Sequence, residues 1–108
     1  MIVPGACGGG GEFYLMDVLE KFVAQNFKCV TINHRGIYPH NITQGKLYHS
    51  GYTDDLEDTM KFLTKNVKDA KFFLLGFSMG GNIITKFIGE QGENARDIYK
   101  VLFFALCK

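Results

Sequence analysis

The chain has 108 residues, of which 46% are hydrophobic and 21% charged, and its formal net charge is +1. These values are typical of one small globular domain, and the balanced charge gives no electrostatic reason to expect nucleic acid as the main partner. No stretch approaches the roughly 18 uninterrupted apolar residues of a membrane-spanning helix, and no basic segment followed by an apolar one marks a signal peptide.

The three cysteines, Cys7, Cys29 and Cys107, are widely spaced and form no C-x-x-C motif. An odd number at such spacing argues against a disulfide framework or a zinc site and favours a reducing, cytoplasmic compartment. No base stands near Cys7 in the sequence, so we expect a small packed thiol there rather than a nucleophile.

The chain opens on a short apolar strand that leads into a glycine-rich loop. Met1–Val3 is typical of the last residues of a buried strand, and Pro4–Gly11 (PGACGGGG) follows directly. A P-loop would need Lys and then Ser or Thr after its last glycine, where this chain continues with Gly-Glu. The G-x-G-x-x-G dinucleotide pattern also fails, because its last glycine would fall on Phe13 or Tyr14. The loop therefore does not predict a nucleotide cofactor.

A helix and a second strand come next. Glu12–Asn26 has the 3.6-residue period of an amphipathic helix, with apolar residues at Leu15, Val18, Leu19, Phe22 and Val23. Lys28–Asn33 (KCVTIN) is rich in β-branched residues and is predicted to be a strand. The segment His34-Arg35-Gly36 follows at the carboxyl end of that strand, which is the edge of a parallel sheet where ligands bind.

A long loop and another helix separate this strand from the next one. Ile37–Ser50 shows neither a helical nor a strand period, so we expect a surface loop there, and His49 near its end is expected to be structural. Asp54 and Glu57 have the spacing of an N-cap and its capping partner, which predicts a helix start. The buried face of this helix would carry Tyr52, Leu56, Met60, Leu63 and Val67. Helix capping accounts for the acidic residues, and no metal ligands converge on them from elsewhere, so no metal site is predicted.

Lys71–Gly89 (KFFLLGFSMGGNIITKFIG) has the layout of a nucleophile elbow, in which a buried strand meets a sharp turn that carries a serine and a helix follows at once. Ser78 would project from this turn in a strained backbone conformation. Side chains two residues before and after it would collide, and Gly76 and Gly80 remove those side chains. A helical pattern runs from Gly81 to Gly89. The alternative is a glycine-rich turn between strand and helix in some other doubly wound protein.

The last apolar run, Val101–Leu106 (VLFFAL), is suited to a strand that is covered on both faces. The order of elements is then strand, helix, strand, loop, helix, strand, helix, strand. This alternation predicts an α/β fold, a parallel sheet of about four strands with helices on both faces.

Four stretches in this order resemble the α/β-hydrolase superfamily and, within it, the esterase and lipase branch that includes medium-chain ester hydrolases and monoacylglycerol lipases: Pro4–Gly11, Asn33–Gly36 (NHRG), Leu47–Leu56 (LYHSGYTDDL) and Gly76–Asn82 (GFSMGGN). GFSMGG marks only the superfamily, whereas NHRG and YHSGYTDDL in register point to the branch. The resemblance implies a partial α/β-hydrolase fold in which the spatial order of the strands is second, first, third, fourth. It also implies that Ser78 attacks a fatty-acyl ester, a small-molecule or lipid substrate, without a cofactor or metal.

The resemblance further implies an oxyanion hole. The family's first donor is the residue after its His-Gly or Pro-Gly pair, here Ala6, and the second is the residue after the nucleophile, Met79. Both would act through main-chain N–H groups, so their side chains matter little. The alternative is a flexible loop with no donor role. The NHRG loop is implied to shape the wall of the site, so His34 is not expected to be catalytic.

The remaining groups of a catalytic triad are not found after Ser78. In this fold an Asp or Glu and then a His follow the serine, but all three histidines of this chain precede it. The carboxylates that follow, Glu90, Glu93 and Asp97, are expected near the wrong end of the sheet to orient a base. A complete domain of this kind needs roughly 200–250 residues. We therefore expect residues 1–108 to be the central part of an incomplete hydrolase core, with the acid, the His and any membrane association in a missing remainder.

Two functions follow from these observations. In the first, the chain is part of a serine carboxylester hydrolase or lipase that works through an acyl-enzyme. In the second, it is a catalytically inactive truncated hydrolase or an interaction module. In both, the isolated chain is expected to show no Ser78-dependent turnover of a short-chain p-nitrophenyl ester, because the base is absent.

Overall fold

The computed structural model describes residues 1–37, 39, 41–42, 45–95 and 99–104. Its elements are β1 (Ile2–Val3), α1 (Phe13–Ala24), α2 (Asp54–Asn66), β2 (Phe72–Phe77), α3 (Met79–Gln91), a short 3-10 turn η1 (Gly92–Asn94) and β3 (Tyr99–Phe104). The helices expected after Glu12 and at Asp54 are confirmed, and the helix after Ser78 begins at Met79 rather than Gly81. Of the strand expected at Val101–Leu106, the last two positions lie outside the described residues.

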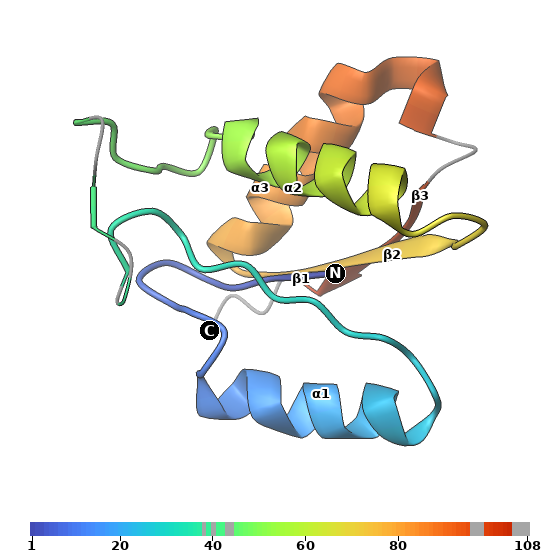
Figure 1. The fold of residues 1–108 in the computed structure, drawn as a ribbon. Coiled ribbons are helices and arrows are strands. Elements are labelled where there is room, and N and C mark those ends of the chain that lie inside the picture. Colours follow the sequence, from blue (N-terminus) through green and yellow to red (C-terminus); the bar gives the residue numbers. More distant parts are fainter. Residues whose placement is uncertain (38, 40, 43–44, 96–98, 105–108) are drawn as a thin grey trace.

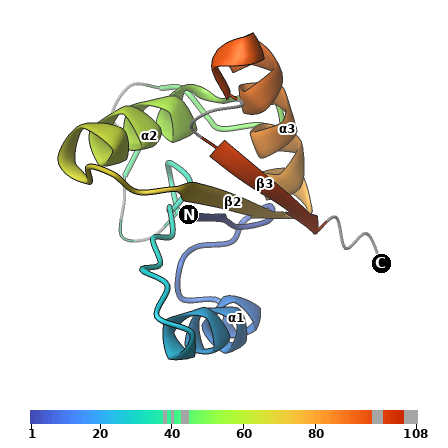
Figure 2. The same cartoon turned by 90° about the vertical axis from the view of Figure 1, so that its right-hand side faces the viewer.

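The three strands form one parallel sheet in the order β1-β2-β3. Ile2 pairs with Leu75, and Phe72–Phe77 pairs with Tyr99–Phe104. One face of the sheet carries α1, and the other carries α2 and α3 (Figures 1 and 2). The predicted α/β class, with parallel strands and helices on both faces, is confirmed.

The fourth strand expected at Lys28–Asn33 forms only an isolated parallel bridge, between Thr31 and Ile2. Ile2 N–H donates to the carbonyl of Val30 (2.7 Å), and Ile32 N–H donates to the carbonyl of Ile2 (3.3 Å). Its partner β1 has only two residues, so this side of the sheet provides few backbone groups for a longer ladder. The segment nevertheless lies next to β1, in the spatial order that the hydrolase topology implies.

Two apolar clusters cover the two faces of the sheet. The cluster against α2 and α3 consists of Val3, Leu56, Met60, Leu74, Ile83, Ile84 and Phe87. The cluster against α1 is smaller and has Ile2, Leu15 and Leu75 at its centre. Neighbours along a strand belong to different clusters, because successive side chains of a strand point to opposite faces. This two-sided burial holds the carboxyl ends of β1 and β2 in fixed positions.

The start of α2 differs from the expected capping arrangement. Thr53, not Asp54, is the N-cap residue, and no side chain caps the helix. The Thr53 hydroxyl donates instead to the Glu90 carboxylate on α3 (2.6 Å), so it is not free to cap. Acidic residues in the first turn of α2 still favour the positive end of the helix dipole. Val67, expected on the buried face, follows the end of α2 and is exposed, because the helix stops at Asn66.

None of the helices in the described part of the chain has both the length and the apolar character that crossing a membrane requires.

Candidate active site

Ser78 lies on the turn between β2 and α3 and is exposed. Its φ of 49° and ψ of −119° fall in a region that residues with a side chain rarely occupy. The Ser78 carbonyl accepts hydrogen bonds from Gly81 N–H (2.9 Å) and Asn82 N–H (3.4 Å), so the first turn of α3 stabilises this conformation. The hydroxyl forms no capping hydrogen bond with α3, a helix that the structure describes in full. The turn therefore presents an exposed serine at a strained junction of strand and helix.

Gly76 and Gly80 occupy positions where backbone segments touch. A Cβ atom on Gly76 would lie 2.5 Å from the nitrogen of Gly81. A Cβ atom on Gly80 would overlap the carbonyl of Val3 and lie 2.5 Å from the carbonyl oxygen of Pro4. Real Cβ atoms essentially never approach other atoms within 3.0 Å. The two glycines therefore permit the tight turn and its close packing against the end of β1.

The glycine-rich loop, Pro4–Gly11, lies beside Ser78. A Cβ atom on Gly5 would be 3.4 Å from Cβ of Ser78, which is ordinary van der Waals contact. The loop turns where Gly8 N–H donates to the Gly5 carbonyl (3.1 Å), and Ala6 and Cys7 within this turn are exposed. In Figure 1 the loop and the start of α3 lie at the same end of the sheet. The expectation of a packed Cys7 thiol is wrong, because this residue sits on the outside of the turn.

The two oxyanion donors expected from the sequence are the main-chain amides of Ala6 and Met79. Met79 is the first residue of α3, so its N–H has no helical carbonyl to bind. Ala6 N–H donates no hydrogen bond to another described residue, although Gly5 and Cys7 on either side of it do. Free N–H groups of this kind can stabilise an oxyanion. The roles assigned to Ala6 and Met79 stay predictions.

Side chains from three other segments fasten the glycine-rich loop. The Tyr14 hydroxyl on α1 accepts from Gly5 N–H (3.3 Å), and Asn33 Oδ1 accepts from Gly10 N–H (2.6 Å). The Tyr48 hydroxyl accepts from Cys7 N–H (2.8 Å). Sequence reasoning did not assign a role to these side chains. Two of them lie in the NHRG and YHSG motifs, so a signal was present, but the motifs alone do not show which backbone group each would bind.

His34 is buried, with 4% of its surface exposed, and its Nε2 atom lies 3.1 Å from the carbonyl oxygen of Pro4. A carbonyl oxygen only accepts hydrogen bonds, so Nε2 must carry a proton for this bond to form. That nitrogen is therefore not available to take a proton from Ser78. His49 is exposed and its Nδ1 accepts from Gly51 N–H (3.1 Å), and His40 lies outside the described residues.

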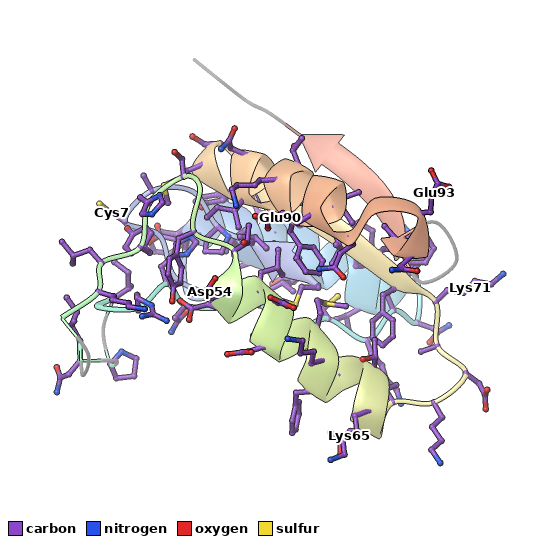
Figure 3. The ribbon with its side chains drawn as sticks, turned by 90° about the horizontal axis from the view of Figure 1, so that it is seen from above. Cys7, Asp54, Lys65, Lys71, Glu90 and Glu93 are labelled. Atoms are coloured by element: carbon purple, nitrogen blue, oxygen red, sulfur yellow. The ribbon has the colours of Figure 1, made fainter. Side chains whose placement is uncertain are left out.

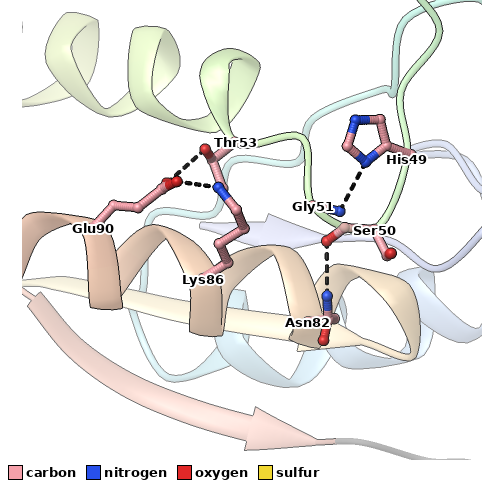
Figure 4. Close-up of polar contacts among 7 residues, drawn as sticks. All are labelled: His49, Ser50, Gly51, Thr53, Asn82, Lys86 and Glu90. Carbon is pink, nitrogen blue, oxygen red and sulfur yellow. Dashed lines mark hydrogen bonds and ion pairs between the residues drawn. The ribbon is translucent and has the colours of Figure 1, made fainter.

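The segment that precedes α2 is tied to α3 by polar contacts (Figure 4). Asn82 donates through Nδ2 to the carbonyl of Ser50 (2.8 Å), close to the start of α3. Further along, the Glu90 carboxylate accepts from Thr53 and forms an ion pair with Lys86. The hydrogen bond from Lys86 lowers the pKa of Glu90, and the one from Thr53 lowers it further. These contacts fix the position of Tyr48 relative to the elbow.

Arg35 of the NHRG motif is held at the start of α2. It donates through Nε to one oxygen of Asp55 (2.9 Å) and through Nη2 to the other, and its guanidinium lies 4.4 Å from the centre of the Tyr52 ring. The side-chain hydrogen bond with Asp55 raises the pKa of Arg35 above its usual value. The paired guanidinium thus serves as a link between the NHRG loop and α2.

The carboxylates that follow Ser78 do not lie beside it. Glu90 is twelve residues further along the chain, which is about 18 Å along a helix at roughly 1.5 Å per residue. Figure 3 shows Glu90 and Glu93 toward the end of α3 that is remote from Cys7. Asp97 lies outside the described residues. Within the described ranges, no three His, Cys, Asp or Glu side chains cluster so that they could bind a metal ion.

The chain matches the family described as serine aminopeptidase, S33 (Hydrolase_4), over residues 1–105. It is 30% identical over 97 residues to a monoacylglycerol lipase of Saccharomyces cerevisiae, with 89% of this chain and 22% of that protein covered. It is 30% identical over 95 residues to monoacylglycerol lipase ABHD2 of Danio rerio, with 87% and 22% covered. Human phospholipase ABHD3 is 27% identical over 93 residues, with 86% and 23% covered.

The chain thus spans 22% to 23% of the length of these relatives. No solved structure matches the chain. The family match nonetheless includes the glycine-rich loop, the NHRG and YHSG segments and the turn at Ser78, and it extends over nearly all of the sequence. The chain therefore belongs to the serine aminopeptidase S33 (Hydrolase_4) family of α/β-hydrolases.

Proposed function

We propose that Ser78 is the nucleophile of a serine hydrolase that cleaves a fatty-acyl carboxylic ester. The observation that carries this proposal is an exposed Ser78 on a turn with φ of 49°, beside Gly5 of the glycine-rich loop, where an added Cβ atom would lie 3.4 Å from Cβ of Ser78. Residues adopt such conformations only where the surrounding structure holds them, and they are concentrated at functional sites. The names of the matched relatives, monoacylglycerol lipases and a phospholipase, support an acyl ester of a lipid as substrate class.

In the first step, Ser78 Oγ attacks the ester carbonyl carbon, and the carbonyl oxygen becomes an oxyanion that accepts from the Ala6 and Met79 N–H groups. Each such donor is worth about 3 kcal/mol in the transition state. The C–O bond to the alcohol then breaks, and the alcohol leaves with the proton that came from Ser78, so an acyl-enzyme remains. In the second step, water attacks the same carbon, the acid is released and Ser78 recovers its proton.

A histidine must carry this proton, with a carboxylate to orient it. No histidine follows Ser78 in these 108 residues, and the Nε2 atom of His34 is bound to Pro4. We propose that the base and its acid belong to a longer form of the protein. The 108 residues alone would then be a catalytically inactive chain, which is the second candidate function. The sequence order, with every histidine before Ser78, favours it for the isolated chain.

A fluorophosphonate probe tests the nucleophile directly, because it labels activated serines. The experiment compares the 108-residue chain with a form that continues beyond Lys108, each as wild type, Ser78→Ala and Ser50→Ala. Ser50 is the other serine of these 108 residues, and it contributes its backbone carbonyl rather than its hydroxyl to the contact with Asn82. It therefore provides a matched control.

We expect strong labelling of the longer form that disappears in Ser78→Ala and persists in Ser50→Ala, and no labelling of the 108-residue chain. Labelling that survives Ser78→Ala would contradict the assignment of the nucleophile. Ser78-dependent turnover of p-nitrophenyl butyrate by the 108-residue chain would show that it already holds a base. Cleavage of an aminoacyl anilide in preference to the ester would overturn the proposed substrate class.

A further inference from the structure

We propose that His34 and Tyr48 form a stacked pair that holds the Ala6 amide in position for the oxyanion. The proposal rests on the function proposed above, since it concerns how the same site is positioned. The two rings come from the NHRG and YHSG segments and lie face to face, with 4.4 Å between their centres and 7° between their planes. Neither ring is placed in the chemistry itself.

Each ring holds a different backbone group of the glycine-rich loop. His34 Nε2 donates to the Pro4 carbonyl at 3.1 Å, and the Tyr48 hydroxyl accepts from Cys7 N–H at 2.8 Å. The Pro4 carbonyl belongs to the peptide group before the one that carries Ala6 N–H, and Cys7 N–H belongs to the peptide group after it. The two bonds therefore fix the peptide groups on both sides of Ala6 and leave its own N–H free.

The loop needs such support because its backbone is strained and rich in glycine. Cys7 has a φ of 58°, in the left-handed region that a residue with a side chain disfavours. Four consecutive glycines, positions 8 to 11, follow it and impose little conformational restriction. A donor that stabilises a transition state must be in place before charge develops, because reorganisation during the reaction would cost part of its effect. The stacked rings provide that rigidity from outside the loop.

The pair is itself held on both sides. His34 is buried beneath the loop, and its neighbour Arg35 binds Asp55 on α2. Two residues after Tyr48, the carbonyl of Ser50 accepts from Asn82 on α3. The loop is thereby connected to the helix that begins at Met79, the second proposed donor. A displacement of either ring would change the position of Ala6 relative to Met79.

The test uses Tyr48→Phe, which keeps the ring and its stacking but removes the acceptor for Cys7 N–H. The matched control is Tyr52→Phe, the same change four residues away on a ring that packs against Arg35 and whose hydroxyl is not among the side-chain groups that hydrogen-bond the glycine-rich loop in the described structure. Amide hydrogen exchange of the whole protein is measured first. We expect exchange at Cys7 to become about tenfold faster in Tyr48→Phe and to stay unchanged in Tyr52→Phe. Equal exchange in the two variants would overturn the proposed pair, whether or not Ser78 is a nucleophile.

The second measurement is the kinetics of ester hydrolysis. It uses whichever form of the protein, 108 residues or longer, the fluorophosphonate probe labels at Ser78. We expect kcat to fall about tenfold in Tyr48→Phe with KM and Tm unchanged, because the oxyanion exists only in the transition state. His34→Gln retains an N–H donor and should recover activity that His34→Ala loses. A rise in KM at constant kcat, or no rescue by His34→Gln, would contradict the positioning role. If no form is labelled at Ser78, the proposed function fails. The amide exchange rate at Cys7 then tests by itself whether Tyr48 and His34 hold the loop.

Discussion

The turn at Ser78 and the glycine-rich loop beside it are both rich in glycine, but they are held in place in different ways. The turn takes its shape from nearby residues. Gly76 and Gly80 admit the close contacts, and the N–H groups of Gly81 and Asn82 in the first turn of α3 bind the Ser78 carbonyl. The loop depends on side chains that are distant in sequence. Tyr14, Asn33 and Tyr48 lie 9, 23 and 41 residues from the backbone groups that they bind.

This difference indicates that the two halves of the proposed site form in different ways. Local backbone geometry shapes the turn at Ser78, whereas the packing of the whole domain positions the glycine-rich loop. A defect in distant packing should therefore disturb the loop before it disturbs the turn. The two halves meet at Gly80, which packs against the carbonyls of Val3 and Pro4 at the end of β1. Substitutions at three positions test the comparison.

Gly80→Ala should have the largest effect, because its Cβ atom would overlap backbone atoms that cannot rotate away. We expect it to lower the free energy of unfolding by about 3 kcal/mol or more, the range of severe overpacking. Gly89→Ala is the control, since Gly89 lies on the same helix and no atom stands within 4 Å of its added Cβ. That variant should be more stable by about 0.5–1 kcal/mol, because alanine favours helix.

Urea denaturation of both variants measures these changes. Similar stabilities for Gly80→Ala and Gly89→Ala would mean that the turn is not packed against β1 as closely as the structure shows.

Asn33→Ala should have an intermediate effect that is confined to the loop. The change removes the acceptor of the 2.6 Å bond from Gly10 N–H, and one such bond contributes about 1 kcal/mol. We expect amide exchange at Gly10 to accelerate while exchange at Gly81, in the first turn of α3, is unchanged. Asn41→Ala, at an exposed position of the long loop, should alter neither amide. Equal acceleration at Gly10 and Gly81 would show that the two halves are not held separately.

Glu90→Gln should have the smallest effect, and it should depend on pH. Hydrogen bonds from Lys86 and Thr53 lower the pKa of Glu90 below its usual value of 4.5 in the folded state. The stabilisation is then fully present above that value and is lost as the pH falls through the lower, folded-state pKa. The Tm difference between wild type and Glu90→Gln should therefore be largest near pH 7 and shrink below pH 4.5.

Glu57→Gln is the control for this substitution. It removes an i,i+4 ion pair with Lys61 on α2 but no contact between two elements. A pH dependence in the Glu57→Gln variant as large as that of Glu90→Gln would show that the link from α3 to Thr53 adds nothing to an ordinary surface pair.

Much of the fold could be predicted from the sequence. Three patterns reflect constraints that act over a few residues: the periodicity of Glu12–Asn26, the apolar run before Ser78 and the glycines around Ser78. The structure has a helix, a strand and a tight turn into a helix at these places. The motif order also predicted the hydrolase family, which the match over residues 1–105 confirms. The roles of Ser78, Ala6 and Met79 in catalysis stay predictions.

The features that were wrong or missed depend on tertiary contacts. Thr53 rather than Asp54 is the N-cap residue of α2, and its hydroxyl does not cap the helix because it donates to Glu90 on another helix. Lys28–Asn33 has the composition of a strand, but its short partner β1 allows only one bridge. His34 and Tyr48 carry no local signal for the backbone groups that they bind, thirty and forty-one residues away.

Sequence alone determined the turn that exposes Ser78, because backbone sterics there are local. Only the folded domain decided how the neighbouring loop is held, because hydrogen bonds between distant segments exist only once packing has brought them together.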